Sequence, residues 1–194
     1  MGLLGPGGVH AHSDHLVGLV RMLPPDVRIC LHLFSDGRDT DRKSFLEYLE
    51  SLQRDLDMDR MTVASISGRY FAMDRDTNWE RTERAFRAVM GTSEAIGTDP
   101  AEWVRDQYAH DVTDEFFPPV RFAGSEPIGA GEAVVFFNFR SDRAKQLARA
   151  FSDAKFDGFS RSVPENLLFA TMTRYYPEFS GKVFLEDTKR DDFL

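Results

Sequence analysis

The sequence contains one cysteine, Cys30, and only five lysines among its 24 basic residues. A single cysteine excludes a disulfide framework and any metal site built from several thiolates. No apolar run approaches the roughly eighteen residues that a membrane-spanning helix needs, and the first residues do not resemble a signal peptide. These absences predict a cytoplasmic protein that has no membrane partner.

Basic residues are outnumbered, since 32 acidic residues against 24 basic ones leave a net charge of −8. Such an excess argues against a surface that binds nucleic acid or anionic membranes. The positive charge that is present is nearly all arginine. Its planar guanidinium group binds phosphate and carboxylate through two parallel hydrogen bonds, which an ammonium group cannot do. If the arginines gather around one pocket, this acidic protein can bind a small anionic ligand.

The pattern of apolar residues predicts an α/β domain. Short apolar runs rich in β-branched and aromatic residues indicate strands at 27–34, 61–67, 133–139 and 167–173. Because these runs are almost continuously apolar, they are typical of a parallel sheet that is covered on both faces. Helical spacing occurs at 13–23, 41–56, 78–90, 100–109 and 142–151, with Ser13 as the expected N-cap of the first helix. We therefore expect a three-layer α/β/α domain with a mostly parallel sheet.

Residues 1–4 are expected to be the end of a further strand that begins earlier. With this strand included, histidine or arginine follows every predicted strand except the last. Ligands of open α/β sheets bind at the carboxyl ends of the strands. The residues concerned are His10, Arg38, Arg69, Arg75, Arg140 and Arg143. We expect them to converge on one edge of the sheet and to bind an anion there, with carboxylates such as Asp36 and Asp39 interleaved. Arg140 and Arg143 are expected at a helix start, where free N–H groups add to an anion site.

Three of the five histidines lie in the stretch VHAHSDH, residues 9–15. The spacing His-x-His-x-Asp-His is that of metallo-β-lactamase-like hydrolases with two zinc ions, so a zinc hydrolase is one hypothesis. Such a site needs further histidine ligands downstream, and only His32 and His110 remain. His32 lies within a predicted strand, where we expect a core histidine, and His110 ends a polar helix. We therefore favour His10 as a hydrogen-bond donor to an oxyanion over the zinc hypothesis.

Five segments of the chain can be read together: GLLGPGGVHAHSDH, LFSDGRDT, SISGRYFAMDRDTNWERTERAF, VVFFNFRSDRAKQL and FDGF. Together they resemble the cofactor-independent (2,3-bisphosphoglycerate-independent) phosphoglycerate mutases. They occur in that family's order, with similar separations, over nearly the whole chain. The resemblance implies a two-domain enzyme that interconverts 3- and 2-phosphoglycerate in glycolysis and gluconeogenesis. Residues 1–180 would be its inserted phosphoglycerate-binding domain, and residues 181–194 would return toward a missing metal-binding domain.

The resemblance also implies cofactors that belong to the missing part. The metal-binding domain of the family carries two Mn²⁺ or Mg²⁺ ions and a serine that becomes phosphorylated, and the reaction does not require 2,3-bisphosphoglycerate. We expect this chain to bind none of these metal ions and to be inactive alone. A stand-alone module that binds phosphoesters stays open as an alternative.

The motif match implies a substrate site made of His10, Arg38, Asp39, Arg69, Arg75, Arg140 and Arg143. In the implied roles, Arg140 and Arg143 neutralise the phosphoryl group, with His10 as a further donor. The pair Arg69 and Arg75 would hold the substrate carboxylate.

Arg38 and Asp39 would contact the hydroxyl groups of the glycerate. Asp39 is our choice for the general acid and base that moves a proton as the two hydroxyls exchange the phosphoryl group.

Overall fold

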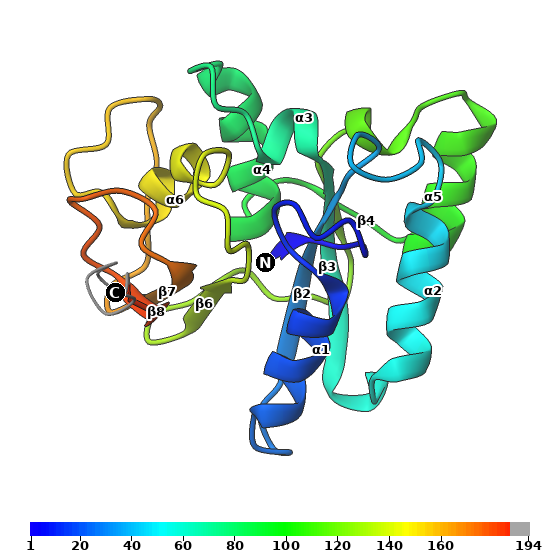
Figure 1. The fold of residues 1–194 in the computed structure, drawn as a ribbon, viewed down its shortest axis with the longest axis horizontal. Coiled ribbons are helices and arrows are strands. Elements are labelled where there is room, and N and C mark those ends of the chain that lie inside the picture. The colour runs from blue at the N-terminus through cyan, green and yellow to red at the C-terminus, as the bar shows by residue number, and fades with distance from the viewer. Residues whose placement is uncertain (187–194) are drawn as a thin grey trace, which may run out of the picture.

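The computed structural model describes residues 1–186, which form two sheets flanked by helices (Figure 1). The first sheet has the strand order β1-β2-β3-β5-β4, with β1 at Gly2–Leu3, β2 at Ile29–Ser35, β3 at Met61–Gly68, β5 at Val120–Phe122 and β4 at Ala95–Ile96. The second has the order β6-β7-β8, with β6 at Ala133–Phe136, β7 at Leu168–Thr173 and β8 at Lys182–Leu185. Among the strands of residues 1–186, only β3 and β5 pair antiparallel. The predicted α/β class with mostly parallel strands is thereby confirmed.

The two sheets meet where we expected one continuous sheet. Phe137, next to β6, donates its N–H to the carbonyl of Met1 at 3.0 Å. Leu3 of β1 donates its N–H to Asn138 Oδ1 at 2.9 Å. The side-chain amide of Asn138 thus takes the place of a backbone partner, so the ladder is interrupted but the two sheets stay side by side.

Helices cover both sides of the first sheet. Figure 1 shows α4 (Trp79–Met90) on one side of β2 and β3, and α2 (Phe45–Asp55) with α5 (Pro100–Ala109) on the other. The remaining helices are α1 at Ser13–Met22, the single turn α3 at Arg69–Ala72, and α6 at Lys145–Ser152, with 3₁₀ turns η1 at Met58–Arg60 and η2 at Asp114–Phe116. Edge-to-face aromatic pairs such as Phe34 with Phe136 fill the core between these layers.

Two helix starts differ from the prediction. The N-cap of α1 is His12, not Ser13, because His12 Nδ1 accepts the N–H of Asp14 at 3.2 Å. Helix α6 begins at Lys145, three residues later than expected, since Ala144 and Lys145 both donate their N–H to the carbonyl of Ser141 and close a tight turn there. Arg140 and Arg143 therefore lie in the turn that leads into α6 and not in the helix itself.

The strand ends also differ slightly. β6 ends at Phe136 rather than at residue 139, because the N–H groups of Phe139 and Arg140 turn to the carbonyl of His10. The short strands β4, β5 and β8 are not visible as apolar runs in the sequence. β8 pairs with β7, while residues 187–194 of the predicted return segment lie outside the described residues.

His32 is the core histidine that its position in a strand predicts. Its side chain is buried, Nδ1 lies 2.8 Å from Ser65 Oγ on the neighbouring strand, and burial lowers the pKa of His32 to about 3. His110 is exposed at the end of α5, also as expected.

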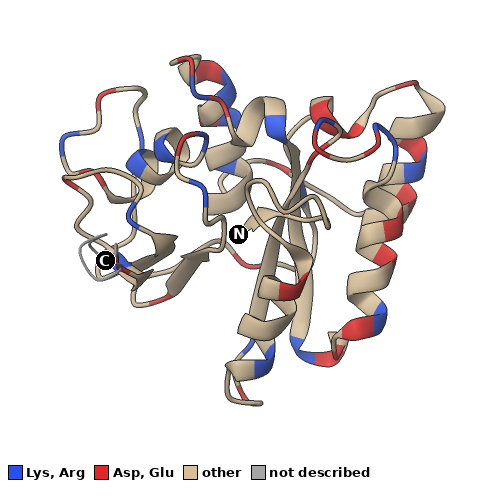
Figure 2. Ribbon diagram, viewed as in Figure 1, with Lys and Arg blue, Asp and Glu red and all other residues tan. Residues whose placement is uncertain are grey.

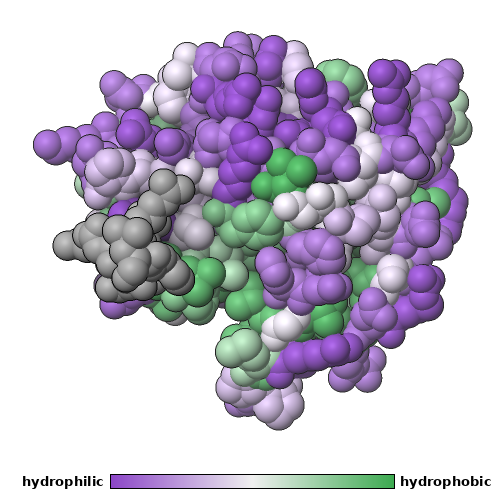
Figure 3. Space-filling model, viewed as in Figure 1, coloured by the Kyte–Doolittle hydropathy of each residue, from purple (hydrophilic) through white to green (hydrophobic). Residues whose placement is uncertain are grey.

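Charge and polarity are distributed unevenly over the surface. Acidic residues line much of α2 and α5 in Figure 2, and basic residues gather in the loops above the strands. The carboxyl ends of β2 and β3 point to the top of Figure 1, where the surface in Figure 3 is strongly hydrophilic. No helix in the described part of the chain is long and apolar enough to cross a membrane.

Candidate phosphoester-binding site

The turn after β2 is held in one conformation by its own residues. Asp36 Oδ1 accepts the N–H groups of Arg38 and Asp39, each at 3.1 Å, which is the usual hydrogen bonding of an aspartate turn. Gly37 has a φ of +72°, and a Cβ atom there would lie only 2.8 Å from the backbone N of Glu115 in η2. Glycine is therefore needed for both reasons. The turn presents Asp39 above the end of the sheet.

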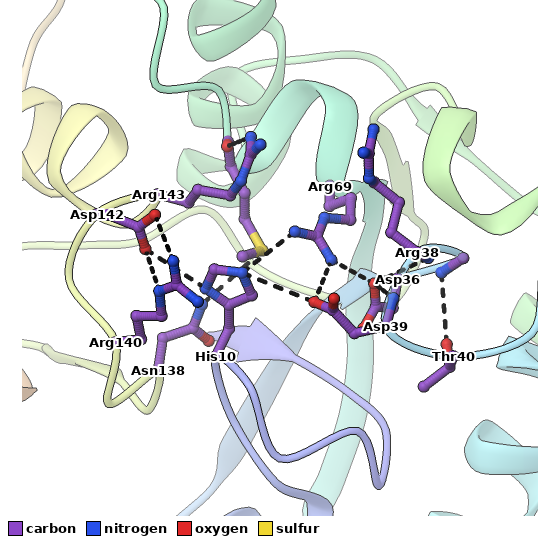
Figure 4. Close-up of polar contacts among 12 residues, drawn as sticks. His10, Asp36, Arg38, Asp39, Thr40, Arg69, Asn138, Arg140, Asp142 and Arg143 are labelled. Atoms are coloured by element: carbon purple, nitrogen blue, oxygen red, sulfur yellow. Dashed lines mark hydrogen bonds and ion pairs between the residues drawn. The ribbon is translucent and has the colours of Figure 1, made fainter.

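Arg69, the first residue after β3, is the buried centre of the site (Figure 4). Its side chain is only 5% exposed, and its Nη1 lies 2.5 Å from Asp36 Oδ1 and 2.7 Å from Asp39 Oδ2. Partial burial raises the pKa of Asp39, but the hydrogen bond and the charge of Arg69 outweigh this and lower it. Asp39 is thus a carboxylate with a fixed orientation at neutral pH.

A second cluster forms around Asp142, in the turn that precedes α6. Its carboxylate lies 2.8 Å from Arg140 Nε and 3.1 Å from Arg140 Nη2, and 3.0 Å from Arg75 Nη1. Partial burial raises the pKa of Asp142, and the hydrogen bond and charge of Arg140 more than compensate and lower it. One carboxylate therefore aligns two guanidinium groups that come from turns far apart in the sequence.

His10 connects the two clusters. Its side chain is buried, with Nε2 at 3.1 Å from Arg69 Nη2 and 3.7 Å from Asp39 Oδ2, and with Nδ1 at 3.7 Å from Asp142 Oδ1. Burial, followed by the charge of Arg69, lowers the pKa of His10. In Figure 4 the ring lies between the Asp39 and Asp142 side chains.

The two remaining arginines lie at the rim of the site. Arg143 Nη1 donates to the carbonyl of Met73 at 3.3 Å, and burial together with the nearby charge of Arg75 lowers the pKa of Arg143. Arg38 is more than half exposed and its Nη1 pairs with Glu115 at 3.3 Å. In Figure 4 the Arg38 side chain points away from His10.

The structure thus places all seven predicted residues around the carboxyl ends of β1, β2, β3 and β6, with Arg38 turned outward. Sequence reasoning missed Asp142, although it stands between Arg140 and Arg143 in the motif RSDR. Asp36, expected as one of the carboxylates interleaved with the arginines, is the partner of Arg69. Asp74 is not part of this site, since it pairs with Arg81 and accepts from Asn78 and Gln146 at the start of α4.

The arrangement suits an anion better than a cation. The guanidinium groups of Arg69, Arg75, Arg140 and Arg143 lie on the His10 side of the site, and the carboxylates of Asp36, Asp39 and Asp142 balance them only in part. Among residues 1–186, no three histidine, cysteine, aspartate or glutamate side chains are placed to hold a metal ion. His12 caps α1, and His15 packs its ring against Phe139 instead of turning toward His10.

An α/β domain with a cationic site at its strand ends is the class that the fold and these contacts define. Comparison with known proteins gives the family. The family model described as BPG-independent PGAM N-terminus (iPGM_N) matches residues 1–177. The chain belongs to the 2,3-bisphosphoglycerate-independent phosphoglycerate mutase family, and the zinc-hydrolase hypothesis is set aside.

Individual relatives support the same family assignment. Proteins named 2,3-bisphosphoglycerate-independent phosphoglycerate mutase from Salinibacter ruber and from Synechococcus sp. (strain JA-3-3Ab) are 44% and 41% identical to this chain, over 96% and 100% of it. The chain spans 38% and 37% of the length of these two relatives. The crystal structure of Leishmania mexicana phosphoglycerate mutase at low cobalt concentration matches 90% of the chain, and 35% of that protein, with a TM-score of 0.80 and 32% identity.

Proposed function

We propose that this chain is the phosphoglycerate-binding domain of a mutase that interconverts 3- and 2-phosphoglycerate. The observation that carries the proposal is the convergence of His10 and of arginines from the segments after β2, β3 and β6 on one edge of the sheet, in a chain whose net charge is −8. Such a concentration of guanidinium groups in an acidic protein is suited to a small ligand with more than one negative charge.

The phosphoryl group of the ligand is proposed to bind near Arg140 and Arg143. Arg140 uses Nε and Nη2 on Asp142, so its Nη1 remains for a ligand oxygen. Within residues 1–186, Arg143 donates only to the carbonyl of Met73 and has further N–H groups to offer. These donors would stabilise the charge of a phosphoryl group as it is transferred.

The carboxylate of the ligand is proposed to bind Arg69 and Arg75. Arg69 has five N–H donors and makes three contacts, to Asp36 and Asp39 through Nη1 and to His10 through Nη2, so further donors remain for a ligand. Arg75 is nearly half exposed and has one contact, to Asp142. Arg38, now paired with Glu115 at the rim, would turn inward to reach the glycerate hydroxyls.

Asp39 is proposed as the general acid and base. It is ionised when the site holds no ligand, because Arg69 lowers its pKa. A bound phosphoglycerate brings like charges toward this carboxylate, which raises its pKa and makes it a better proton acceptor. The ligand thus prepares the base that acts on its own hydroxyl group.

The rest of the reaction is proposed to need parts outside this chain. The described residues do not fit the two Mn²⁺ or Mg²⁺ ions that the family implies, because they offer no group of metal ligands. We assign these ions, the phosphorylated serine and the independence from 2,3-bisphosphoglycerate to the full-length protein, whose metal-binding domain would be the partner of this site. A cytoplasmic location is proposed with this function.

Calorimetric titration with 3-phosphoglycerate tests the proposal. We expect weak, saturable binding to the wild-type chain and a loss of affinity of about tenfold or more in Arg140→Ala, since a charge-assisted hydrogen bond is removed. Arg105→Ala is the control, because Arg105 lies on α5 and pairs with Glu50 of α2 away from the site. Equal affinities for Arg140→Ala and the wild type would place the binding site elsewhere.

A further inference from the structure

The protonation of His10 follows from its neighbours. A guanidinium group has only N–H donors, so Arg69 Nη2, at 3.1 Å from His10 Nε2, must donate to that nitrogen. Nε2 is then an acceptor, and the single proton of the neutral ring is on Nδ1. Burial and the charge of Arg69 lower the pKa of His10, which keeps the ring neutral at pH 7.

The proton on Nδ1 faces Asp142. Nδ1 and Asp142 Oδ1 are 3.7 Å apart, and both atoms are buried without a hydrogen-bond partner among the described residues. Oδ1 does lie 2.8 Å from Arg140 Nε, as an ion pair whose angle is not that of a hydrogen bond. Two buried atoms of complementary character that face each other at this distance are expected to act on each other.

Asp142 also fixes the two arginines that carry no other carboxylate partner in the described part of the chain, Arg75 and Arg140. The backbone of Asp142 lies in the turn closed by the hydrogen bond from Ala144 to Ser141, which fixes the position from which its side chain extends. One side chain therefore contacts both sides of the site: the histidine that faces Arg69 and Asp39, and the guanidinium groups at the opposite side.

We propose that Asp142 is the positioning residue of this site: it holds His10 in the Nδ1–H form and aligns Arg75 and Arg140 for the phosphoester anion. The proposal rests on the proposed function only for the identity of that anion. His10 then acts as an acceptor that orients Arg69, and through Arg69 the carboxylate of Asp39. This differs from the role of oxyanion donor that the sequence indicates for His10.

The first test uses the wild-type chain alone. A long-range ¹H–¹⁵N correlation spectrum of the imidazole rings at pH 7 distinguishes a protonated from an unprotonated ring nitrogen. We expect the proton of His10 on Nδ1 and none on Nε2. A proton on Nε2 would overturn the proposal, and this result does not depend on any variant folding or on any ligand.

The second test compares Asp142→Asn with Asp26→Asn. Asp26 is exposed in the connection between α1 and β2, at the far end of the sheet, so its substitution makes the same change of charge away from the site. Because the charge of Asp142 raises the pKa of His10, we expect that pKa, followed by NMR, to fall further in Asp142→Asn and to stay unchanged in Asp26→Asn.

Titration with 3-phosphoglycerate completes the comparison. We expect about tenfold weaker binding to Asp142→Asn, although the site becomes more positive by one charge, and unchanged binding to Asp26→Asn. Equal or tighter binding to Asp142→Asn would overturn the proposal, since Asp142 would then compete with the ligand for the arginines. If the wild-type chain itself fails to bind, the proposed function falls, and the pKa of His10 in Asp142→Asn still tests the role of Asp142, with an unchanged pKa counting against it.

Discussion

Arg69 and Asp36 form an ion pair at 2.5 Å with side chains that are only 5% and 3% exposed. Asp36 in turn accepts the N–H groups of the turn that carries Asp39. The pair therefore links the end of β3 to the turn after β2. Stability and the geometry of the site depend on the same contact.

Removal of this arginine should destabilise the protein strongly. Arg69→Ala leaves the buried Asp36 carboxylate without its partner, and breaking a buried pair in this way costs about 3–5 kcal/mol. Arg105→Ala breaks the exposed pair with Glu50 and should cost at most about 1 kcal/mol. Urea unfolding of both variants measures the difference. Similar free energies of unfolding for the two variants would contradict a stabilising role of the buried ion pair between Arg69 and Asp36.

The pH dependence of stability should reveal Asp39. Its pKa in the folded protein is lowered below the ordinary 3.8, so its contribution is present above about that pH and is lost as the pH falls through the folded value. Asp39→Asn should therefore show a shallower loss of stability between neutral pH and the acid range than the wild type. Chemical unfolding at a series of pH values gives both slopes, and parallel curves would show that Asp39 is not paired in the folded state.

Gly37→Ala should disturb the turn more than its φ alone requires. The added Cβ would lie 2.8 Å from the backbone N of Glu115, whereas Gly124, with a φ of +88°, has nothing within 4 Å of such an atom. Gly124→Ala is the control. Both Gly37→Ala and Gly124→Ala carry the strain of a positive φ, on the order of 1 kcal/mol, and only Gly37→Ala adds the clash with η2. We expect a clearly larger loss of stability for Gly37→Ala, and weaker binding of 3-phosphoglycerate. Thermal unfolding that shifts equally in both variants would refute the close approach.

The hydroxyl of Tyr108 should contribute to stability through Asp114. Tyr108 donates to Asp114 Oδ1 at 2.5 Å, and the other oxygen of this buried carboxylate accepts the N–H groups of Ser44 and Phe45 at the start of α2. Tyr108→Phe should cost about 1.5–3 kcal/mol, because it leaves a buried charged acceptor without one donor. Tyr48→Phe, whose hydroxyl has no protein partner in the described structure, serves as the control in denaturant unfolding. A cost for Tyr108→Phe no larger than that of the control would contradict this account.

The isolated chain should not catalyse the reaction. Incubation with Mn²⁺ and 3-phosphoglycerate should yield no 2-phosphoglycerate in an enzyme-coupled assay, because the proposed nucleophile and metal ions belong to the rest of the protein. Formation of 2-phosphoglycerate by the purified chain would show that the site is complete without that part.

The fold class and the gathering of the site residues could be predicted because both follow from local patterns. Each long strand is an apolar run, and parallel strands bring the turns that follow them to one edge of the sheet. His10, Arg69 and Arg140 meet for that reason.

Features that depend on distant contacts could not be predicted in this way. β4 and β5 have two and three residues, too few for a period, and their place is set by the pairing of β5 with β3 and of β4 with β5. The start of α2 is capped by Asp114, about seventy residues away. Asp142 falls at the start of a helix expected at 142–151, and its role depends on the turn at 141–144 that the structure has there instead.

The most direct test of the central claim is a crystal structure of this chain with 3-phosphoglycerate. We expect the phosphoryl group against Arg140 and Arg143, the carboxylate against Arg69 and Arg75, and a glycerate hydroxyl within hydrogen-bonding distance of Asp39. A ligand bound away from these side chains, or a site between them that stays empty at saturating ligand, would contradict it.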